Sequence, residues 1–427
     1  MTSNDFLPPQ AVQFQEDLDP LLESTLEFEE SARQLDLEEF ILQRLRHMER
    51  EITVNLPLKR EHGGVSSITG FRVQHHCGGA PTLGTLRLSP DANLSALRSA
   101  AMAMTWQLAL LQIPFGGAAG AVVCNPEELS ERELHALIRD YLHALRGIVG
   151  PFTDVVAPDA GCNPQTMAWM LDSYARAAGR TEPAVATGKP AVLWGLPDYY
   201  SAAAAGIMAL LRHIAARQGS SIVGQRAAIQ GFGTVGSSVA RALYDSGARI
   251  VAVADLSGGL YNAAGINISE LEAHATRKHV LFGFPEAEAV CNADVLEADC
   301  ELLVLAAHER QIGATNAERI HAPLVIEATH AAVTHAAEEA LSRQGVRIVP
   351  DLLANAGAVL AAFAEWKQNT ALAPQMPGTL SDLVAGEIIR AYDLVHQAAT
   401  KNNLRLRTAA FRIALERVAS RIRLMSW

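Results

Sequence analysis

Residues 226–236 have the sequence Arg-Ala-Ala-Ile-Gln-Gly-Phe-Gly-Thr-Val-Gly, in which a short apolar run leads directly into three glycines. The apolar run predicts a buried strand, and the residues from Ser237 to Asp245 predict a helix. A second predicted strand, 249–254, ends at Asp255, 22 residues after the second glycine. A strand, a G-x-G-x-x-G turn, a helix, a strand and an acid in this order are typical of a dinucleotide-binding βαβ unit.

Each glycine of this fingerprint has its own physical role. Gly231 permits the tight turn, Gly233 lets a pyrophosphate approach the backbone, and Gly236 allows the helix and the strand to pack closely. The unpaired amides at the start of the helix would face the phosphates, and the acid would accept hydrogen bonds from an adenosine ribose. The same glycines could also be present only because they permit close packing of a compact sheet. They therefore indicate the fold, but they do not show that the protein catalyses hydride transfer. The predicted dinucleotide-binding residues are Gly231, Gly233, Thr234, Val235, Gly236 and Asp255.

Outward from the fingerprint, strands and helices alternate, which predicts an α/β protein with a parallel sheet. The further strand-like runs of this sheet are 301–306, 322–327 and 346–350. Upstream, the acid-rich and leucine-rich residues 16–50 predict amphipathic helices. The remaining predicted elements are strands at 52–58 and 70–75 and helices at 131–148, 165–178, 201–217 and 378–427.

Composition excludes several classes of protein. The chain of 427 residues has 35 basic and 46 acidic side chains, a net charge of −11 that argues against non-specific nucleic-acid binding. No apolar stretch reaches the length of a membrane span, and the first residues lack the basic start and apolar core of a secretory signal. Five widely spaced cysteines without a C-x-x-C pair predict reduced thiols, a cytoplasmic location and no metal site.

Further motifs resemble those of the glutamate dehydrogenase family, the Glu/Leu/Phe/Val dehydrogenases, in the family's order over residues 45–427. They are Phe71-Arg-Val-Gln-His75, Pro81-Thr82, Asp154-Val-Val-Ala-Pro-Asp159, Asn163-Pro-Gln, Met167-Ala-Trp-Met170, Thr187-Gly-Lys-Pro190, Gln230-Gly-Phe-Gly-Thr-Val-Gly236, Gly258-Gly-Leu-Tyr-Asn262 and Pro350-Asp-Leu-Leu-Ala-Asn-Ala-Gly357. The resemblance implies a two-domain amino-acid dehydrogenase fold. It assigns 1–190 to a substrate and oligomerisation domain, 191–355 to a Rossmann-like domain, and 356–427 to helices that pack back on the first domain.

The family's chemistry needs lysines that this chain lacks. The resemblance places Leu83 at the lysine that holds the side-chain carboxylate, Gln107 at the lysine that holds the α-carboxylate, and Ala119 at the catalytic lysine. A substrate-binding serine of the family becomes Ala362, whereas the proton-shuttling aspartate is retained as Asp159. Alanine has no proton to exchange, and a neutral amide cannot neutralise an anion. Lys189, in the Thr-Gly-Lys-Pro segment, is interpreted as structural rather than as a replacement base.

The coenzyme side shows a similar division. Tyr199 stands where the family has an arginine, and Ala203 where it has a threonine that binds the carboxamide. The family's Glu-x-Ala-Asn-Gly becomes Glu327-Ala-Thr-His-Ala331, while Asn355 survives. NAD or NADP therefore remains a predicted cofactor through the adenosine and phosphate half of its site.

These substitutions favour a catalytically silent regulatory subunit of a hetero-oligomeric, hexameric glutamate dehydrogenase. An alternative hypothesis is an active NAD(P)-dependent dehydrogenase for glutamate or an apolar amino acid, because apolar-substrate relatives also have an apolar residue at the position of Leu83. A third is a binding module for an effector such as leucine, AMP or ADP. Only five of the 35 basic residues are lysine, yet none of the three lost lysines has become arginine.

Overall fold

The computed structural model describes residues 19–75, 80–371 and 378–425. These residues form two compact units. Unit 1 comprises residues 200–357 and 384–407, and unit 2 comprises the remaining described residues, 19–199, 358–383 and 408–425 with the gaps stated above. The expectation that no secretory signal is present rests on residues that lie outside the described ranges.

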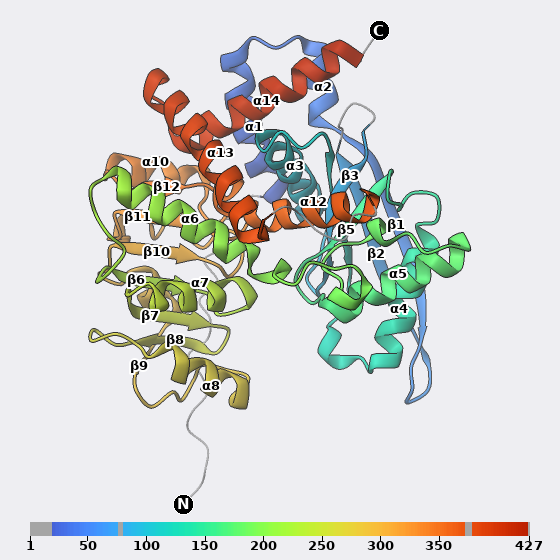
Figure 1. Ribbon diagram of the computed structural model, residues 1–427, viewed down its shortest axis with the longest axis horizontal. Coiled ribbons are helices and arrows are strands. Elements are labelled where there is room, and N and C mark those ends of the chain that lie inside the picture. The colour runs from blue at the N-terminus through green and yellow to red at the C-terminus, as the bar shows by residue number, and fades with distance from the viewer. Residues whose placement is uncertain (1–18, 76–79, 372–377, 426–427) are drawn as a thin grey trace, which may run out of the picture. The chain divides into compact units, whose positions relative to one another are not determined.

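Unit 1 is built on a seven-stranded sheet in the order β12-β11-β10-β6-β7-β8-β9 (Figure 1). Its first five strands in this order are parallel, whereas β8 and β9 continue the sheet as antiparallel strands. The strands are β6 (Arg226–Gln230), β7 (Arg249–Asp255), β8 (Gly258–Tyr261), β9 (Glu288–Val290), β10 (Leu302–Leu305), β11 (Leu324–Glu327) and β12 (Arg347–Val349). The chain order reverses between β6 and β10, the place where open α/β sheets bind ligands beyond their strand ends.

Helices cover this sheet and enclose its core. They are α6 (Ala202–Arg217), α7 (Thr234–Asp245), α8 (Ile268–Lys278), α9 (Asn292–Leu296), α10 (His335–Arg343), α11 (Asp351–Ala354) and residues 384–402 of α13 (Leu380–Asn402). The central strands are apolar on both faces, as strands covered by helices on two sides must be. Every residue of β10, for example, is buried.

Unit 2 contains a five-stranded mixed sheet in the order β1-β2-β4-β3-β5. The strands are β1 (Met48–Lys59), β2 (Val65–His75), β3 (Thr82–Leu88), β4 (Gly116–Val122) and β5 (Asp154–Pro158). The pairs β1–β2 and β2–β4 are antiparallel, and β3 is parallel to both β4 and β5. In this sheet Arg72 donates from Nε to Asp154 Oδ2 at 2.8 Å, and both side chains are fully buried.

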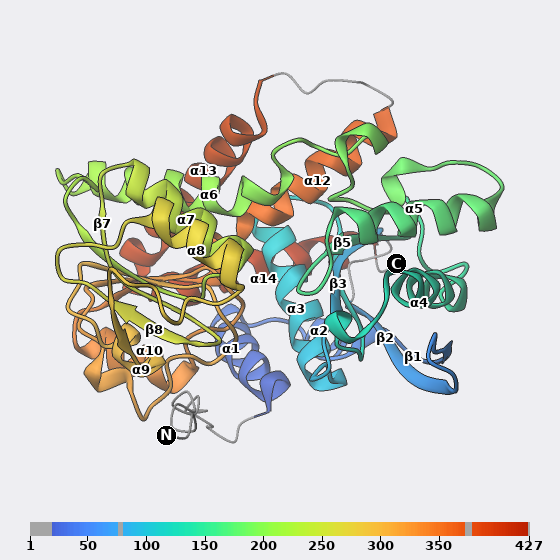
Figure 2. The same cartoon turned by 90° about the horizontal axis from the view of Figure 1, so that it is seen from below.

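Each face of the unit 2 sheet has its own hydrophobic cluster. On one face Leu86 and Leu88 pack with side chains of α4 and α5, and on the other α3 packs across β4 and β2 (Figure 2). The helices of this unit are α1 (Pro20–Leu35), α2 (Glu39–Arg46), α3 (Leu94–Leu110), α4 (Glu131–Ala144), α5 (Pro164–Ala178), most of α12 (Ala356–Ala371) and most of α14 (Leu406–Met425).

The element predictions from sequence are confirmed in type, with shifted ends. The dinucleotide-fingerprint helix starts at Thr234 rather than Ser237, because the helix N-cap is Gly233 itself. The helix predicted to end at residue 148 ends at Ala144, and Gly147 beyond it has a positive φ of 79°. Strands β8 and β9 were absent from the predicted sheet. No helix among the described residues combines the length and apolar composition needed to cross a membrane.

Candidate active site and dinucleotide loop

The unit 2 positions that the resemblance singles out lie on neighbouring strands of one sheet. Leu83, Thr85 and Arg87 alternate along β3 and therefore point to the same face. Because parallel partners share a face, Ala119 of β4 also lies on it through its pairing with Thr85. Asp159 follows β5, and its backbone N–H donates to the carbonyl of Leu86 at 3.0 Å. This three-strand face brings Leu83, Ala119 and Asp159 into one region of unit 2.

Helix α3 packs on the three-strand face at Ala119. The methyl of Ala119 belongs to an apolar cluster that includes Val73 of β2 and Leu97 and Ala101 of α3, and it is 1% exposed. A Cβ on Gly117, two residues earlier on the same face, would lie 2.2 Å from the carbonyl oxygen of Ala101. The position of the family's catalytic lysine is therefore a close-packed, apolar contact between sheet and helix.

Asp159 is held by polar neighbours on β3. The guanidinium of Arg87 forms an ion pair with its Oδ2 at 3.2 Å, and the hydroxyl of Thr85 donates to the same oxygen at 3.3 Å. The other oxygen, Oδ1, accepts the N–H of Ala160 at 2.7 Å. Sequence reasoning did not identify Thr85 or Arg87 as partners. The available signal was the two-residue spacing of Leu83, Thr85 and Arg87, which places all three on one face of a strand.

Three further unit 2 side chains complete the described picture of this region. Leu83 is 1% exposed, Gln107 in the last turn of α3 is 7% exposed, and Ala362 of α12 is 2% exposed. Each of these positions is buried, and two of them carry apolar side chains. A dicarboxylate buried there would need a compensating cation, and none of these three residues supplies one.

Lys189 makes a structural ion pair. Its Nζ donates to Glu365 Oε1 at 2.6 Å and to the carbonyl of Ala186, and both charged side chains are fully buried. The other oxygen of Glu365 accepts backbone N–H groups from Gly188 and Leu196. Burial lowers the pKa of Lys189, although the partner carboxylate opposes that change. Because its ammonium donates to both Glu365 and Ala186, Lys189 is engaged in a contact that stabilises the fold.

The glycine loop of unit 1 has the geometry of an anion cradle. Gly231 has a φ of 100°, and a Cβ there would lie 2.6 Å from the backbone of Ala306. A Cβ on Gly236 would lie 1.9 Å from the carbonyl oxygen of Gly231, so this glycine is required by helix–strand packing. Gly233 differs, because a Cβ there would meet no atom within 4 Å.

The start of α7 leaves backbone donors available for a ligand. Gly233 is the N-cap and provides no side-chain cap, while Gly233 and Thr234 are exposed. The first amides of a helix lack partners within it and attract anions. Open space over Gly233 together with uncapped amides at Thr234, Val235 and Gly236 fits the pyrophosphate of a dinucleotide.

Asp255 ends β7 beside this loop and is fixed by donors. Its Oδ1 accepts the backbone N–H of Ser257 at 2.7 Å and also the Ser257 hydroxyl, and its Oδ2 accepts the N–H of Leu281 at 2.8 Å. Two carboxylate oxygens have about four acceptor positions in all. Capacity for a ribose hydroxyl therefore remains while the carboxylate orientation is set by the backbone.

The segment where the family has Glu-x-Ala-Asn-Gly forms part of a buried charge network in unit 1. His330 Nδ1 lies 2.8 Å from Asp351 Oδ2. Arg407 contacts Glu327, Glu338 and Asp351, and its Nη1 lies 3.4 Å from Asp351 Oδ1. Burial is the largest influence on the pKa values of Glu327, His330 and Asp351.

Three acids share this network with one arginine and one histidine, and their pKa values respond. Burial raises the pKa of Glu327 to about 7, with Asp351 adding to the effect and Arg407 opposing it. Burial would raise the pKa of Asp351, but the hydrogen bond and charge of His330 lower it to about 2. Burial would lower the pKa of His330, but the bond to Asp351 raises it.

The other coenzyme-side positions are separate from this network. Asn355 is the C-cap of α11 and is partly buried, and Ala203 in the first turn of α6 is 4% exposed. In unit 2 the hydroxyl of Tyr199 lies 3.0 Å from Thr187 Oγ1 in a buried hydrogen bond. Neither Ala203 nor the engaged Tyr199 supplies the groups that the family has at these positions.

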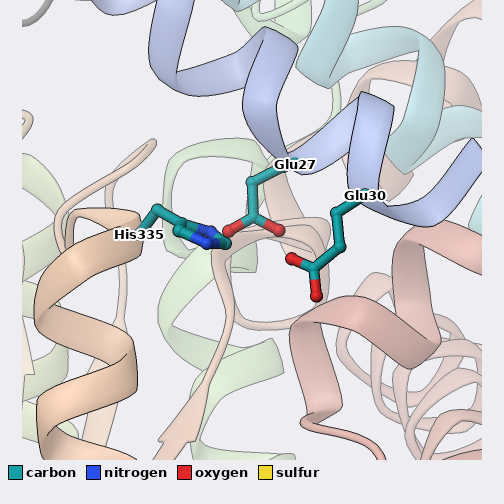
Figure 3. Close-up of side chains that lie close together, drawn as sticks. All are labelled: Glu27, Glu30 and His335. Carbon is teal, nitrogen blue, oxygen red and sulfur yellow. The ribbon is translucent and has the colours of Figure 1, made fainter. Parts of the chain in front are cut away.

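Figure 3 labels Glu27, Glu30 and His335. Glu27 and Glu30 lie one turn apart on α1 of unit 2, whereas His335 begins α10 of unit 1. Two carboxylates from one helix fall short of a metal-ligand set. We therefore infer no metal site from them, and the predicted absence of a metal stays a prediction.

Two family models match most of the chain. Residues 48–176 match the Glu/Leu/Phe/Val dehydrogenase dimerisation domain, and residues 195–424 match the Glutamate/Leucine/Phenylalanine/Valine dehydrogenase model. The chain belongs to this family. Its members are NAD(P)-dependent oxidoreductases of amino-acid metabolism, and the dimerisation domain supports oligomerisation of the chain.

Individual relatives agree with the family assignment. The chain is 36% identical to Glutamate dehydrogenase A2 from Halobacterium salinarum over 401 residues, covering 94% of this chain and 96% of the relative. It is 35% identical to Glutamate dehydrogenase from Thermotoga maritima over 403 residues, covering 92% and 95%. The structure is also similar to a hetero-hexameric glutamate dehydrogenase from Thermus thermophilus in a Leu-bound form. That comparison has a TM-score of 0.90 and 34% identity, and it covers 97% of this chain and 99% of that one.

These findings confirm the predicted family and the two-domain α/β fold of a glutamate dehydrogenase-like protein. The roles of Leu83, Gln107, Ala119, Asp159 and Ala362, and of the dinucleotide-binding residues, stay predictions.

Proposed function

We propose that this chain is a catalytically silent regulatory subunit of a hetero-oligomeric glutamate dehydrogenase. The observation that carries the proposal is the three-strand face of unit 2. Leu83 and Ala119 are buried and apolar on that face, and Asp159, the retained acid, is already paired with Arg87 and Thr85.

The chemistry of the family explains why this face is decisive. Oxidative deamination needs a lysine of lowered pKa to activate water and an acid nearby to move protons. Ala119 has no titratable group, and the buried Lys189 is occupied by Glu365 and Ala186. Losing a general base typically costs two to four powers of ten in rate. Several such losses together would leave no useful turnover.

The apolar side chains of this region favour an apolar ligand. With Leu83 and Ala362 buried, a ligand that enters would meet aliphatic surface where glutamate would need a cation. Leucine is therefore the proposed effector in this region of unit 2. The Leu-bound, hetero-hexameric relative from Thermus thermophilus supports both leucine as the effector and a hexamer as the assembly.

The glycine loop supports a second ligand class. The open space over Gly233, the uncapped amides of α7 and the fixed carboxylate of Asp255 fit the adenosine and pyrophosphate half of NAD or NADP, or AMP or ADP. The described cysteines Cys124, Cys162, Cys291 and Cys300 are free thiols, which favours the reducing cytoplasm as the site of action.

A second candidate function is an active dehydrogenase for an apolar amino acid. Leu83 favours it, since an aliphatic residue there would accommodate an aliphatic substrate side chain. Ala119 argues against it, because the same proton transfers are needed whichever amino acid is oxidised.

Turnover assays separate the two candidates. The purified chain is assayed with glutamate, with leucine, valine and phenylalanine, and with 2-oxoglutarate plus ammonium, each with NAD and NADP. We expect no turnover above about 0.01 s⁻¹, against the 1–10³ s⁻¹ of ordinary enzymes. Turnover of about 1 s⁻¹ with any amino acid would overturn the silent assignment and establish the second candidate.

Regulation is tested by co-expression with an active glutamate dehydrogenase from the same source. We expect the two chains to co-purify as one assembly, in which leucine changes the rate more than it does for the active chain alone. Leu83→Ala should weaken the leucine response about tenfold, whereas Val65→Ala, at a 70% exposed position, should leave it unchanged. Separate elution of the two chains would contradict the regulatory role.

A further inference from the structure

A cluster of basic side chains lies in unit 1, away from the glycine loop. It forms where the end of α6, the middle of α13 and the start of β12 meet. Its members are His213, Arg217, Arg347 and His396, with Asp393 and Tyr392 among them. We call these six residues the basic cluster.

Asp393 organises the α6 side of the basic cluster. A single carboxylate oxygen, Oδ1, lies 2.8 Å from His213 Nε2 and 3.2 Å from Arg217 Nη1. The ring of Tyr392 meets that of His213 edge to face at 5.8 Å and lies 5.7 Å from the ring of His396. Tyr392 is 1% exposed, so the two imidazoles flank a fixed aromatic spacer.

Arg347 enters from the sheet edge without a compensating acid. The side-chain amide of Gln218 is assigned with its oxygen toward Arg347. That oxygen then accepts from the guanidinium, at 3.0 Å from Nη2. Within the described ranges, no carboxylate forms an ion pair with Arg347, and no side-chain hydrogen bond engages the ring of His396. Arg347 is exposed, and Arg217 is 47% exposed. Donors therefore remain available to a ligand.

The electrostatic balance of the basic cluster is positive in a chain whose net charge is −11. Two guanidinium groups, of Arg217 and Arg347, face the one carboxylate of Asp393. Burial lowers the pKa of His396, and the charges of Arg217 and Arg347 lower it further, with His213 adding and Asp393 opposing. Burial raises the pKa of Tyr392, and the charges of the same two arginines oppose that change.

The position of the basic cluster separates it from the dinucleotide site. Arg347 is the first residue of β12, at the amino end of a parallel strand. Gly231 and the acid Asp255 lie at the carboxyl ends of the parallel strands β6 and β7. The two ends of a parallel sheet are opposite edges, so one ligand does not serve both places.

We propose that the basic cluster binds a polyphosphate anion, such as the di- or triphosphate of a nucleotide. Guanidinium groups bind phosphate through two parallel hydrogen bonds, and imidazolium adds a charged donor. Groups from three elements suit an anion with several charged centres better than a single carboxylate. Such a ligand would join α6, α13 and β12 within unit 1. Binding itself is independent of the proposed regulatory function, and only an effect on a partner's rate would rest on it.

Calorimetric titration of the full-length chain tests the proposal. Inorganic tripolyphosphate and ADP are titrated separately, which distinguishes free polyphosphate from nucleotide. We expect tripolyphosphate to bind, and Arg217→Ala and Arg347→Ala each to weaken it at least tenfold. Arg132→Ala, which removes the same charge from an exposed position on α4 of unit 2, should leave the affinity unchanged.

Proton uptake provides a second readout. An anion beside His396 would raise the pKa of its imidazole, so binding near pH 7 should take up protons, measured in buffers of different ionisation enthalpy. His396→Gln should reduce that uptake. Equal weakening by Arg132→Ala would show only non-specific charge attraction, and unchanged affinity in both Arg217→Ala and Arg347→Ala would place the anion elsewhere. Either result overturns the proposal, and neither depends on turnover or on a partner chain.

Discussion

Gly233 in unit 1 and Ala119 in unit 2 are both positions that the family resemblance singles out, the first for the pyrophosphate and the second for the catalytic lysine, but their surroundings differ. A side chain at Gly233 would meet no atom within 4 Å, so the loop keeps the space that a pyrophosphate needs. Ala119 is packed against α3, among Val73, Leu97 and Ala101. The loop at Gly233 therefore has the shape of a binding site, whereas the region around Ala119 is packed like a protein core.

The difference shows which constraints each region obeys. Gly84 and Gly117 of unit 2 are as sterically necessary as Gly236 of unit 1, since a Cβ on Gly84 would lie 1.9 Å from the carbonyl oxygen of Ala118. Glycines that close packing requires are thus present in both units. What differs is the side chains on the three-strand face, where Leu83 and Ala119 stand at positions for which the resemblance expects lysines.

The largest expected effect comes from two glycines three residues apart. Gly236→Ala would place a methyl 1.9 Å from the carbonyl oxygen of Gly231, so we expect a loss of about 3 kcal/mol or more in the free energy of unfolding. Gly233→Ala should leave that free energy unchanged or raise it by about 0.5 kcal/mol, because φ is −78° and the space is open. Denaturant unfolding of the two variants measures both values.

Ligand binding reverses this order of importance. Gly233→Ala should weaken NAD binding at least tenfold, since the new methyl occupies the space above the first amides of α7. Fluorescence titration with NADH checks it in the same preparations. If Gly233→Ala binds NADH as tightly as the unaltered chain does, the pyrophosphate does not lie over Gly233, and the contrast between the two regions disappears.

A smaller effect is expected from the charge network of Glu327, His330, Asp351 and Arg407. Glu327 has a raised pKa of about 7 in the folded state, so its contribution is complete below 4.5 and is lost as pH rises to 7. His330, also raised, acts in the same direction beyond its usual 6.5. Between pH 5 and 8 we therefore expect stability to fall by on the order of 3 kcal/mol.

Single variants test whether the charge network causes this fall in stability between pH 5 and 8. Thermal unfolding at steps from pH 5 to 8 should show a flatter profile for Glu327→Gln and for His330→Asn, while the exposed His321→Gln keeps the original slope. Asp351 has a lowered pKa of about 2, so its contribution is lost only as pH falls below 3.8. Stability that rises steadily from pH 5 to 8 would contradict the network account.

Sequence and structure agree where backbone geometry leaves a local signature. The strand at Arg226–Gln230, the glycine turn and Asp255 are visible in the sequence because each needs a particular residue type at a fixed spacing. The antiparallel strands β8 and β9 were missed, since four-residue and three-residue edge strands carry little periodicity.

Contacts between distant residues were beyond the sequence for a different reason. Asp159 and Arg87 are 72 residues apart, Lys189 and Glu365 are 176 apart, and the basic cluster combines three separate elements. Such pairs depend on sheet register and helix packing, which no local pattern specifies. The sequence shows that Leu83 and Ala119 are apolar, but it could not predict that they are buried beneath α3 or within the sheet.

The smallest expected effect concerns how Asp159 is kept on the three-strand face. Thr85→Val retains the shape of the side chain but removes the hydroxyl that donates to Asp159 Oδ2 at 3.3 Å. We expect a loss of about 1 kcal/mol in the free energy of unfolding, the usual net value of one such bond. Thr276→Val, whose exposed hydroxyl donates to a carbonyl within α8, should lose less than about 0.5 kcal/mol.

The size of this difference decides what Asp159 now does. If Thr85→Val costs more than Thr276→Val in denaturant unfolding, the carboxylate is a packing partner of β3, held by Thr85 and Arg87 in place of a catalytic lysine. Equal losses would mean that Asp159 gains nothing from Thr85 and is retained for a ligand instead. In that case the part of the three-strand face around Asp159 would resemble the glycine loop, because it would still be shaped to bind a ligand, and it would differ from the apolar packing around Ala119.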